Sequence, residues 1–83
     1  MAEGRSNIKP DRTLDAQGLF CPEPVFRTNL EMQKMMLNQI LEVLADDPGA
    51  DPDISSWAKR TGQQLISLTK EGRRLRFLLR KLK

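Results

Sequence analysis

The sequence of 83 residues predicts an α/β (α+β) fold, a two-layer sandwich in which two helices cover one face of a four-stranded mixed sheet. Three observations lead to this prediction. Apolar and polar residues alternate over 74–81, which is the period-two pattern of a half-buried strand. Apolar residues recur at helical spacing over 25–36. Proline and glycine separate the segments, so that the elements follow in the order β-α-β-α-β-β.

The first half of the chain predicts a short strand over 13–15 and then a helix that opens at 21–24. Proline is tolerated in a first helical turn because the N–H groups there have no intrahelical partner. Glu23 in that turn favours the positive end of the helix dipole. The helix should run to about Met36, with Asn38 as a left-handed stop. Its expected apolar face consists of Val25, Thr28, Asn29, Met32, Met35 and Met36.

The second half predicts a strand over 40–45, a second helix and a hairpin. Asp51 is the expected N-cap of that helix, and Gly62 is its expected end. The hairpin strands should cover 64–70 and 74–81.

The β-α-β crossover is expected to be right-handed, which places the first helix on one face of the sheet. With the second helix on the same face, Ile40, Leu44 and Leu78 would point from the uncovered face. This is more apolar surface than an open face normally carries, so it indicates a partner, a second copy or cover by the N-terminal segment.

The length predicts one domain, over residues 11–83, preceded by a polar and disordered segment over 1–10. That segment has no apolar signal-peptide core, and no apolar run is long enough for a membrane span. We therefore expect a cytoplasmic protein that does not contact a membrane.

Two absences restrict the chemistry. The chain contains no histidine, which excludes Ser-His-Asp and Cys-His nucleophiles and imidazole metal ligands. It contains one cysteine, Cys21, which excludes an internal disulfide, a CxxC redox pair and a zinc ribbon. The sequence thus predicts neither a metal nor a cofactor.

Charge is distributed unevenly. From Lys59 onward there are nine basic residues and one acidic residue, whereas the remainder has five basic and ten acidic residues. Arg74, Arg76 and Arg80 are therefore candidates for a surface that binds an anionic protein or nucleic acid. A solvated hairpin face is the alternative.

Cys21 is the candidate reactive group because it lies where a loop meets a helix. A helix N-terminus lowers a thiol pKa, whereas nearby carboxylates raise it. The end of the second strand should bring Asp46 and Asp47 close to Cys21, and Glu23 lies in the same turn. We expect a modest net depression of the Cys21 pKa, with a buried and inert cysteine as the alternative.

The segment L-D-A-Q-G-L-F-C-P-E-P at 14–24 resembles the N-terminal signature of the TusA/SirA/YedF-like family, whose hallmark is Cys-Pro-x-Pro. The likeness continues through 41–48, 53–54 and Trp57 to the closing hairpin. One departure is that Asn38-Gln39 stands where the family often has a glycine, and asparagine tolerates the same backbone region.

The resemblance implies a sulfur carrier rather than a self-sufficient enzyme. Cys21 would accept a persulfide sulfur from a cysteine desulfurase or rhodanese-like donor and pass it to an acceptor protein, towards tRNA thiolation, molybdenum cofactor supply or sulfur oxidation. Pro22 and Pro24 would shape the start of the helix, and Glu23 matches the common residue at the variable position.

Three residues just past Cys21 are candidates for partner binding. Phe26 and Leu30 lie one turn apart and off the apolar face of the helix. They form either a hydrophobic docking spot or a flank that packs on a neighbouring loop. Arg27 occupies an exposed helix position, for which a solvated face is the alternative.

Two other classes of function remain open. The basic strands favour a small nucleic-acid-binding domain, although the chain has no tyrosine and no row of aromatic residues on which bases would stack. The other class is a redox-regulatory adaptor whose cysteine is glutathionylated or forms an intermolecular disulfide.

Overall fold

The computed structural model describes residues 9–83 and has the predicted element order. Most of the segment 1–10, for which disorder was predicted, lies outside the described residues. The elements are β1 (Arg12–Asp15), α1 (Glu23–Gln33), β2 (Ile40–Ala45), α2 (Ala50–Thr61), β3 (Gln64–Glu71) and β4 (Arg74–Arg80). No helix within residues 9–83 is both long enough and apolar enough to cross a bilayer.

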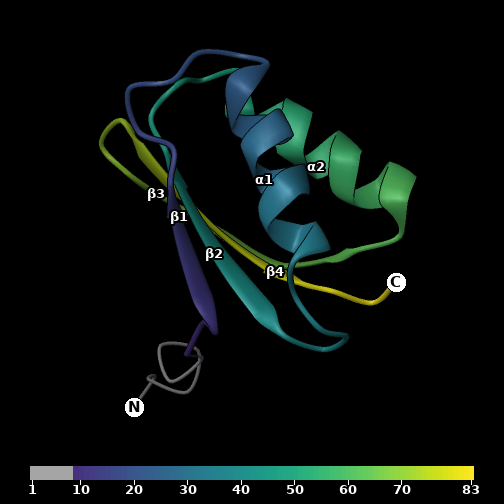
Figure 1. Cartoon of the computed structure of the whole chain (residues 1–83). Coiled ribbons are helices and arrows are strands. Elements are labelled where there is room, and N and C mark those ends of the chain that lie inside the picture. Colours follow the sequence, from purple (N-terminus) through teal and green to yellow (C-terminus); the bar gives the residue numbers. More distant parts are fainter. Residues whose placement is uncertain (1–8) are drawn as a thin grey trace.

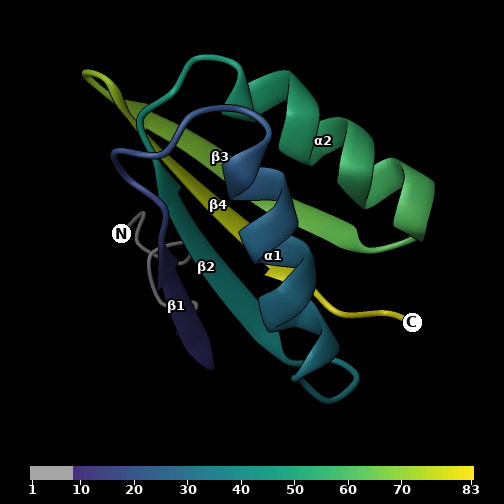
Figure 2. The same ribbon diagram turned by 45° about the horizontal axis from the view of Figure 1, so that its top comes forward.

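The four strands form one mixed sheet in the order β1-β2-β4-β3. β1 is parallel to β2, and β4 is antiparallel to both of its neighbours. Both helices lie side by side on one face of this sheet, which gives two layers (Figure 1, Figure 2). The predicted two-layer α/β sandwich is confirmed.

The core lies between the helices and the covered face of the sheet. Alternation places Leu41, Val43 and Ala45 on that face of β2, and all three are fully buried. β4 contributes Phe77 and Leu79 in the same way. The helices supply Met32, Met35, Ile54, Trp57 and Ala58.

The two helices are also joined by a polar contact. Trp57 on α2 donates its indole N–H to the side-chain oxygen of Asn29 on α1, at 3.3 Å. A buried indole normally requires such an acceptor. The contact therefore links the two helices in addition to their apolar packing.

The uncovered face of the sheet differs from the expectation. Leu78 points from it, as predicted, but only 2% of Leu78 is exposed. Ile40 and Leu44 are half-buried. Between them lies an ion pair, because Arg76 donates to Glu42 on the neighbouring strand. The three residues therefore do not form the exposed apolar patch that the sequence predicted.

Both helices have boundaries that differ from the prediction. α1 ends at Gln33 rather than near Met36, whose side chain is 72% exposed. Asn38 has the predicted left-handed backbone, with φ 73°, but it lies in the turn that follows the helix. α2 begins at Ala50 with Gly49 as its N-cap, and so Asp51 lies inside the first turn.

Candidate functional site

Cys21 lies in the turn between β1 and α1 and is exposed. The helix itself begins at Glu23, within the predicted opening at 21–24, with Pro22 as its N-cap residue. The peptide bond between Cys21 and Pro22 is cis. Pro24 is buried, and its carbonyl accepts the hydroxyl of buried Thr28 at 2.7 Å. Because Cys21 is exposed, the alternative of a buried cysteine is wrong.

Two carboxylates at the end of β2 bind the backbone of this turn. Asp46 accepts the N–H of Gly18 at 2.9 Å, and Asp47 accepts the N–H of Cys21 at 2.9 Å. The parallel pairing of β1 with β2 brings these segments together, as the sequence predicted. Both contacts are to backbone N–H groups, for which a carboxylate is a strong acceptor.

Asp53, in the first turn of α2, is a site residue that sequence reasoning missed. The Cys21 thiol donates a hydrogen bond to its Oδ2. The start of α2 lies close to the turn: a Cβ at residue 49, which is glycine, would lie 3.5 Å from the Cβ of Cys21 and 3.2 Å from Asp47 Oδ2. The available signal was topological, since two helices on one sheet face, each following a parallel strand, begin at the same edge.

This environment raises the pKa of the Cys21 thiol above its ordinary value. The hydrogen bond to Asp53 is the largest cause, and loss of water and the negative charges of Asp53 and Asp47 act in the same direction. The expected net depression of the Cys21 pKa is therefore wrong. The hydrogen bond stabilises the protonated thiol.

A shallow groove of about 350 Å³ runs from Cys21 between the two helices. Cys21, Pro22, Val25 and Phe26 line one side, and Asp53, Ser56 and Arg60 of α2 line the other. Phe26 is 57% exposed, and so the groove offers an accessible aromatic surface directly beside the thiol.

The other candidates on α1 do not line the groove. Leu30 is 54% exposed one turn further along the helix. Arg27 is exposed and pairs with Glu23 at 3.5 Å. Phe26 is thus the predicted partner-binding residue that the structure brings together with Cys21.

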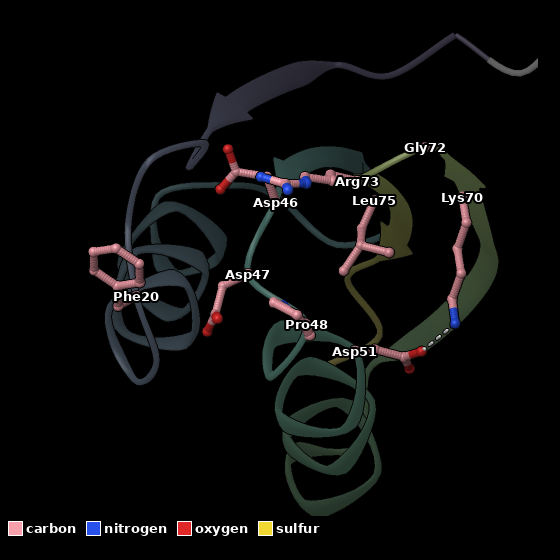
Figure 3. A pocket seen from close by; sticks show the side chains of 9 residues that line it. All are labelled: Phe20, Asp46, Asp47, Pro48, Asp51, Lys70, Gly72, Arg73 and Leu75. Carbon is pink, nitrogen blue, oxygen red and sulfur yellow. Dashed lines mark ion pairs between the residues drawn. The ribbon is translucent and has the colours of Figure 1, made fainter.

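A second depression, of about 620 Å³, opens on the other side of the same turn (Figure 3). Phe20, Asp46 and Asp47 line it on the side of the turn, and Lys70 and Arg73 of the hairpin line it on the opposite side. Asp51 forms an ion pair with Lys70 there, at 3.2 Å. Asp47 therefore faces this depression while its Oδ2 accepts the N–H of Cys21.

The predicted basic surface lies on the uncovered face of the sheet. Arg74 pairs with Glu71 at 2.9 Å, and Arg76 pairs with Glu42. Arg80 lies opposite Ile40 in the sheet, at the end that is far from the Cys21 turn. Its buried Nε has no hydrogen-bond partner in the described part of the chain. Two of these three cations are thus neutralised within the molecule, which weakens the case for nucleic-acid binding.

The architecture matches that of a solved structure, a SirA-like protein from Desulfitobacterium hafniense, with a TM-score of 0.76. The match covers 87% of this chain and 99% of the other at 22% identity, which establishes a SirA-like fold. Among the residues that the structure describes, no group of three or more acidic or cysteine side chains could hold a metal ion.

The sequence comparisons then identify the family. The model of the family described as "Sulfurtransferase TusA" matches residues 12–81. The chain belongs to the TusA family.

Curated relatives extend this result to proteins from several organisms. YrkI of Bacillus subtilis, named a putative sulfur carrier protein, is 45% identical over 89% of this chain and 99% of its own length. TusA of Allochromatium vinosum, named a sulfur carrier protein, is 41% identical over 86% of this chain and 93% of its own. A putative sulfur carrier protein of Aquifex aeolicus is 51% identical over 78% of this chain, but the match spans only 33% of that longer protein.

Proposed function

We propose that this protein is a sulfur carrier that holds a persulfide on Cys21. The family membership and the names of the relatives support a sulfur-carrier role. The position of Cys21 is the observation that supports the assignment of the persulfide to this residue. The only thiol of the chain is exposed at the mouth of a groove with an accessible aromatic wall.

The transfer is a thiol–persulfide exchange. Cys21 sulfur attacks the terminal sulfur of a donor persulfide, so a new S–S bond forms on Cys21 and the S–S bond of the donor breaks. The donor leaves as a thiolate, which takes up the proton that Cys21 loses. Discharge to an acceptor repeats the exchange in the opposite sense, and neither step has a net oxidant or reductant.

The composition requires two partner proteins in this scheme. Without a second cysteine the chain cannot resolve a persulfide internally, and without histidine it has no imidazole base. We propose a cysteine desulfurase or a rhodanese-like protein as the donor and a separate protein as the acceptor. Delivery towards tRNA thiolation is the pathway that we propose to test first.

We assign supporting roles to the residues around Cys21. Pro22, Glu23 and Pro24 shape the turn and the start of α1, and Asp46 and Asp47 hold the turn through its N–H groups. Phe26, with Leu30 and Arg27 further along α1, would contact the partner. We further propose that residues 11–83 act as one domain, because all six elements share one core.

Mass spectrometry of the intact protein tests the proposal. After incubation with a cysteine desulfurase and cysteine, we expect an adduct of one sulfur atom, about 32 Da, that reducing agents remove. Cys21→Ser should fold normally and remain unmodified. The absence of this adduct with both a desulfurase and a rhodanese-like donor would contradict the proposal, and a glutathione adduct alone would indicate a redox adaptor.

A further inference from the structure

The carboxylates around Cys21 differ in whether a cation neutralises them. Glu23 pairs with Arg27 at 3.5 Å, and Asp51 pairs with Lys70 at 3.2 Å. Asp53 has no cation within ion-pair distance among residues 9–83, although it accepts the thiol of Cys21. Asp47 likewise has no paired cation in that range and accepts the N–H of Cys21.

The groups that face Cys21 are therefore mostly anionic. They are Asp53 from α2 and Asp47 from the loop after β2, and Glu23, two residues along the chain, is paired with Arg27. Arg60 lines the same groove as Asp53 but lies seven residues, about two helical turns, further along α2. The groove thus has an anionic end at the thiol and a cationic end away from it.

We propose that the protein that exchanges sulfur with Cys21 presents a cationic side chain, arginine or lysine, to Asp53, and that this ion pair replaces the Cys21–Asp53 hydrogen bond. The inference rests on the proposed function and names the chemistry of the partner surface. Arginine suits this contact best, because its guanidinium binds a carboxylate through two parallel hydrogen bonds.

The consequence is a thiol whose reactivity depends on docking. In the free carrier the hydrogen bond to Asp53 keeps the proton on Cys21, and thiols react as thiolates. An incoming cation neutralises Asp53, removes its hydrogen bond from the sulfur and adds a positive charge nearby. Each change favours the thiolate. The proton that leaves Cys21 passes to the departing thiolate of the donor.

The apolar wall of the groove restricts where this partner binds. Phe26 and Val25 face the same groove, so a partner segment that covers them also places its neighbouring side chain beside Asp53. Arg60 repels a cation at the other end of the groove. The partner's cation is therefore directed to the thiol end, and its contact surface should be apolar beside that cation.

Three thiol reagents of different charge test the anionic environment without any partner protein. They are neutral iodoacetamide, a cationic aminoethyl methanethiosulfonate and an anionic sulfonatoethyl methanethiosulfonate. The variants are Asp53→Asn and, as a matched control, Asp51→Asn, which removes the same charge from the same helical turn but leaves the thiol contact intact. Circular dichroism confirms that each variant is folded.

Asp53→Asn should react faster with iodoacetamide near neutral pH, and its rate–pH profile should move to lower pH. The gain should be about threefold for each unit by which the pKa falls, because more thiolate forms but each thiolate is less nucleophilic. The ratio of cationic to anionic reagent rates should exceed one in the unmodified protein and fall in Asp53→Asn. Asp51→Asn should match the unmodified protein.

Equal rates for Asp53→Asn and the unmodified protein would overturn the inference, and so would equal acceleration in Asp51→Asn. These results are independent of sulfur transfer. A sulfur adduct on Cys21 without an effect of Asp53→Asn would leave the proposed function intact and remove the inference. An effect of Asp53→Asn without any sulfur adduct would remove the proposed function, and with it the sulfur-exchanging partner, and would leave only the influence of Asp53 on the thiol.

Discussion

Single residues at the Cys21 turn act mainly through hydrogen bonds to the backbone. Asp47 and Asp46 are adjacent in sequence, yet they bind different N–H groups, those of Cys21 and Gly18. Removal of either carboxylate should therefore loosen one end of the same turn, so that each variant serves as the control for the other.

Asp47→Ala should speed amide hydrogen exchange at Cys21 by up to about tenfold, since the N–H loses its acceptor. Asp46→Ala should have that effect at Gly18 and leave Cys21 unchanged. Site-resolved exchange measured by NMR distinguishes the two. If both variants speed exchange equally at both positions, the carboxylates do not act through the bonds described here.

At the uncovered sheet face, Glu42 is the residue whose charge matters for stability. Its hydrogen bond from Arg76 lowers the pKa of Glu42, and one from Thr13 adds to this effect. When folding lowers the pKa of a carboxyl group, that group stabilises the fold at any pH above its pKa in the unfolded chain. The stabilisation is lost as the pH falls through the pKa that the group has in the folded protein.

Glu42→Gln should therefore lower the free energy of unfolding near neutral pH by up to about 1 kcal/mol and have less effect in acid, below the usual pKa range of a carboxyl. Urea unfolding at several pH values measures this difference. Glu71→Gln is the control, because the pair of Glu71 with Arg74 is exposed and should contribute little. A Glu42→Gln effect that does not change with pH would contradict the account.

Among the elements, α2 depends on a glycine at its end. Gly62 is the C-cap residue with φ +79°, a conformation that costs a residue with a Cβ atom. A Cβ at this position would also lie 2.9 Å from the flexible side chain of Lys83.

Gly62→Ala should destabilise the protein by about 1 kcal/mol, and Gly62→Asn should cost less because asparagine tolerates left-handed backbone. Thermal or urea unfolding compares the two variants. If alanine and asparagine cost the same, the backbone conformation is not the cause.

The elements also show what periodicity can and cannot predict. Alternation in 40–45 and 74–80 predicted both the strands and their buried faces, because a strand has only two faces and one packs on helices. The end of α1 was predicted three residues late. Met35 continues the apolar face beyond the end of the helix. The carbonyl groups of Met32 and Met35 accept hydrogen bonds from the Lys81 ammonium, at 3.0 and 2.8 Å. Lys81 follows β4, so a residue far away in the sequence supplies the hydrogen-bond donors that the end of a helix needs.

At the scale of the whole molecule, the candidate site forms where two helix starts and two strand ends meet (Figure 1). The motif around Cys21 indicated that its thiol is the reactive group, and the strand topology predicted that Asp46 and Asp47 lie close to it. The same topology places the start of α2 at this edge of the sheet, but it does not tell which residue of α2 reaches Cys21. That contact, made by Asp53, depends on the separation between the two helices, which Trp57 and Asn29 connect. The direction of the Cys21 pKa shift was consequently predicted with the wrong sign.

The central claim is that Cys21 carries sulfur from one protein to another, and a discharge experiment tests it most directly. The protein is loaded with isotopically labelled sulfur by a desulfurase, separated from the donor and mixed with an acceptor protein that has a reactive thiol. The account predicts that labelled sulfur leaves Cys21 and appears on the acceptor, with none transferred by Cys21→Ser. Label that stays on Cys21 with every acceptor, or that reaches the acceptor equally with Cys21→Ser, would contradict it.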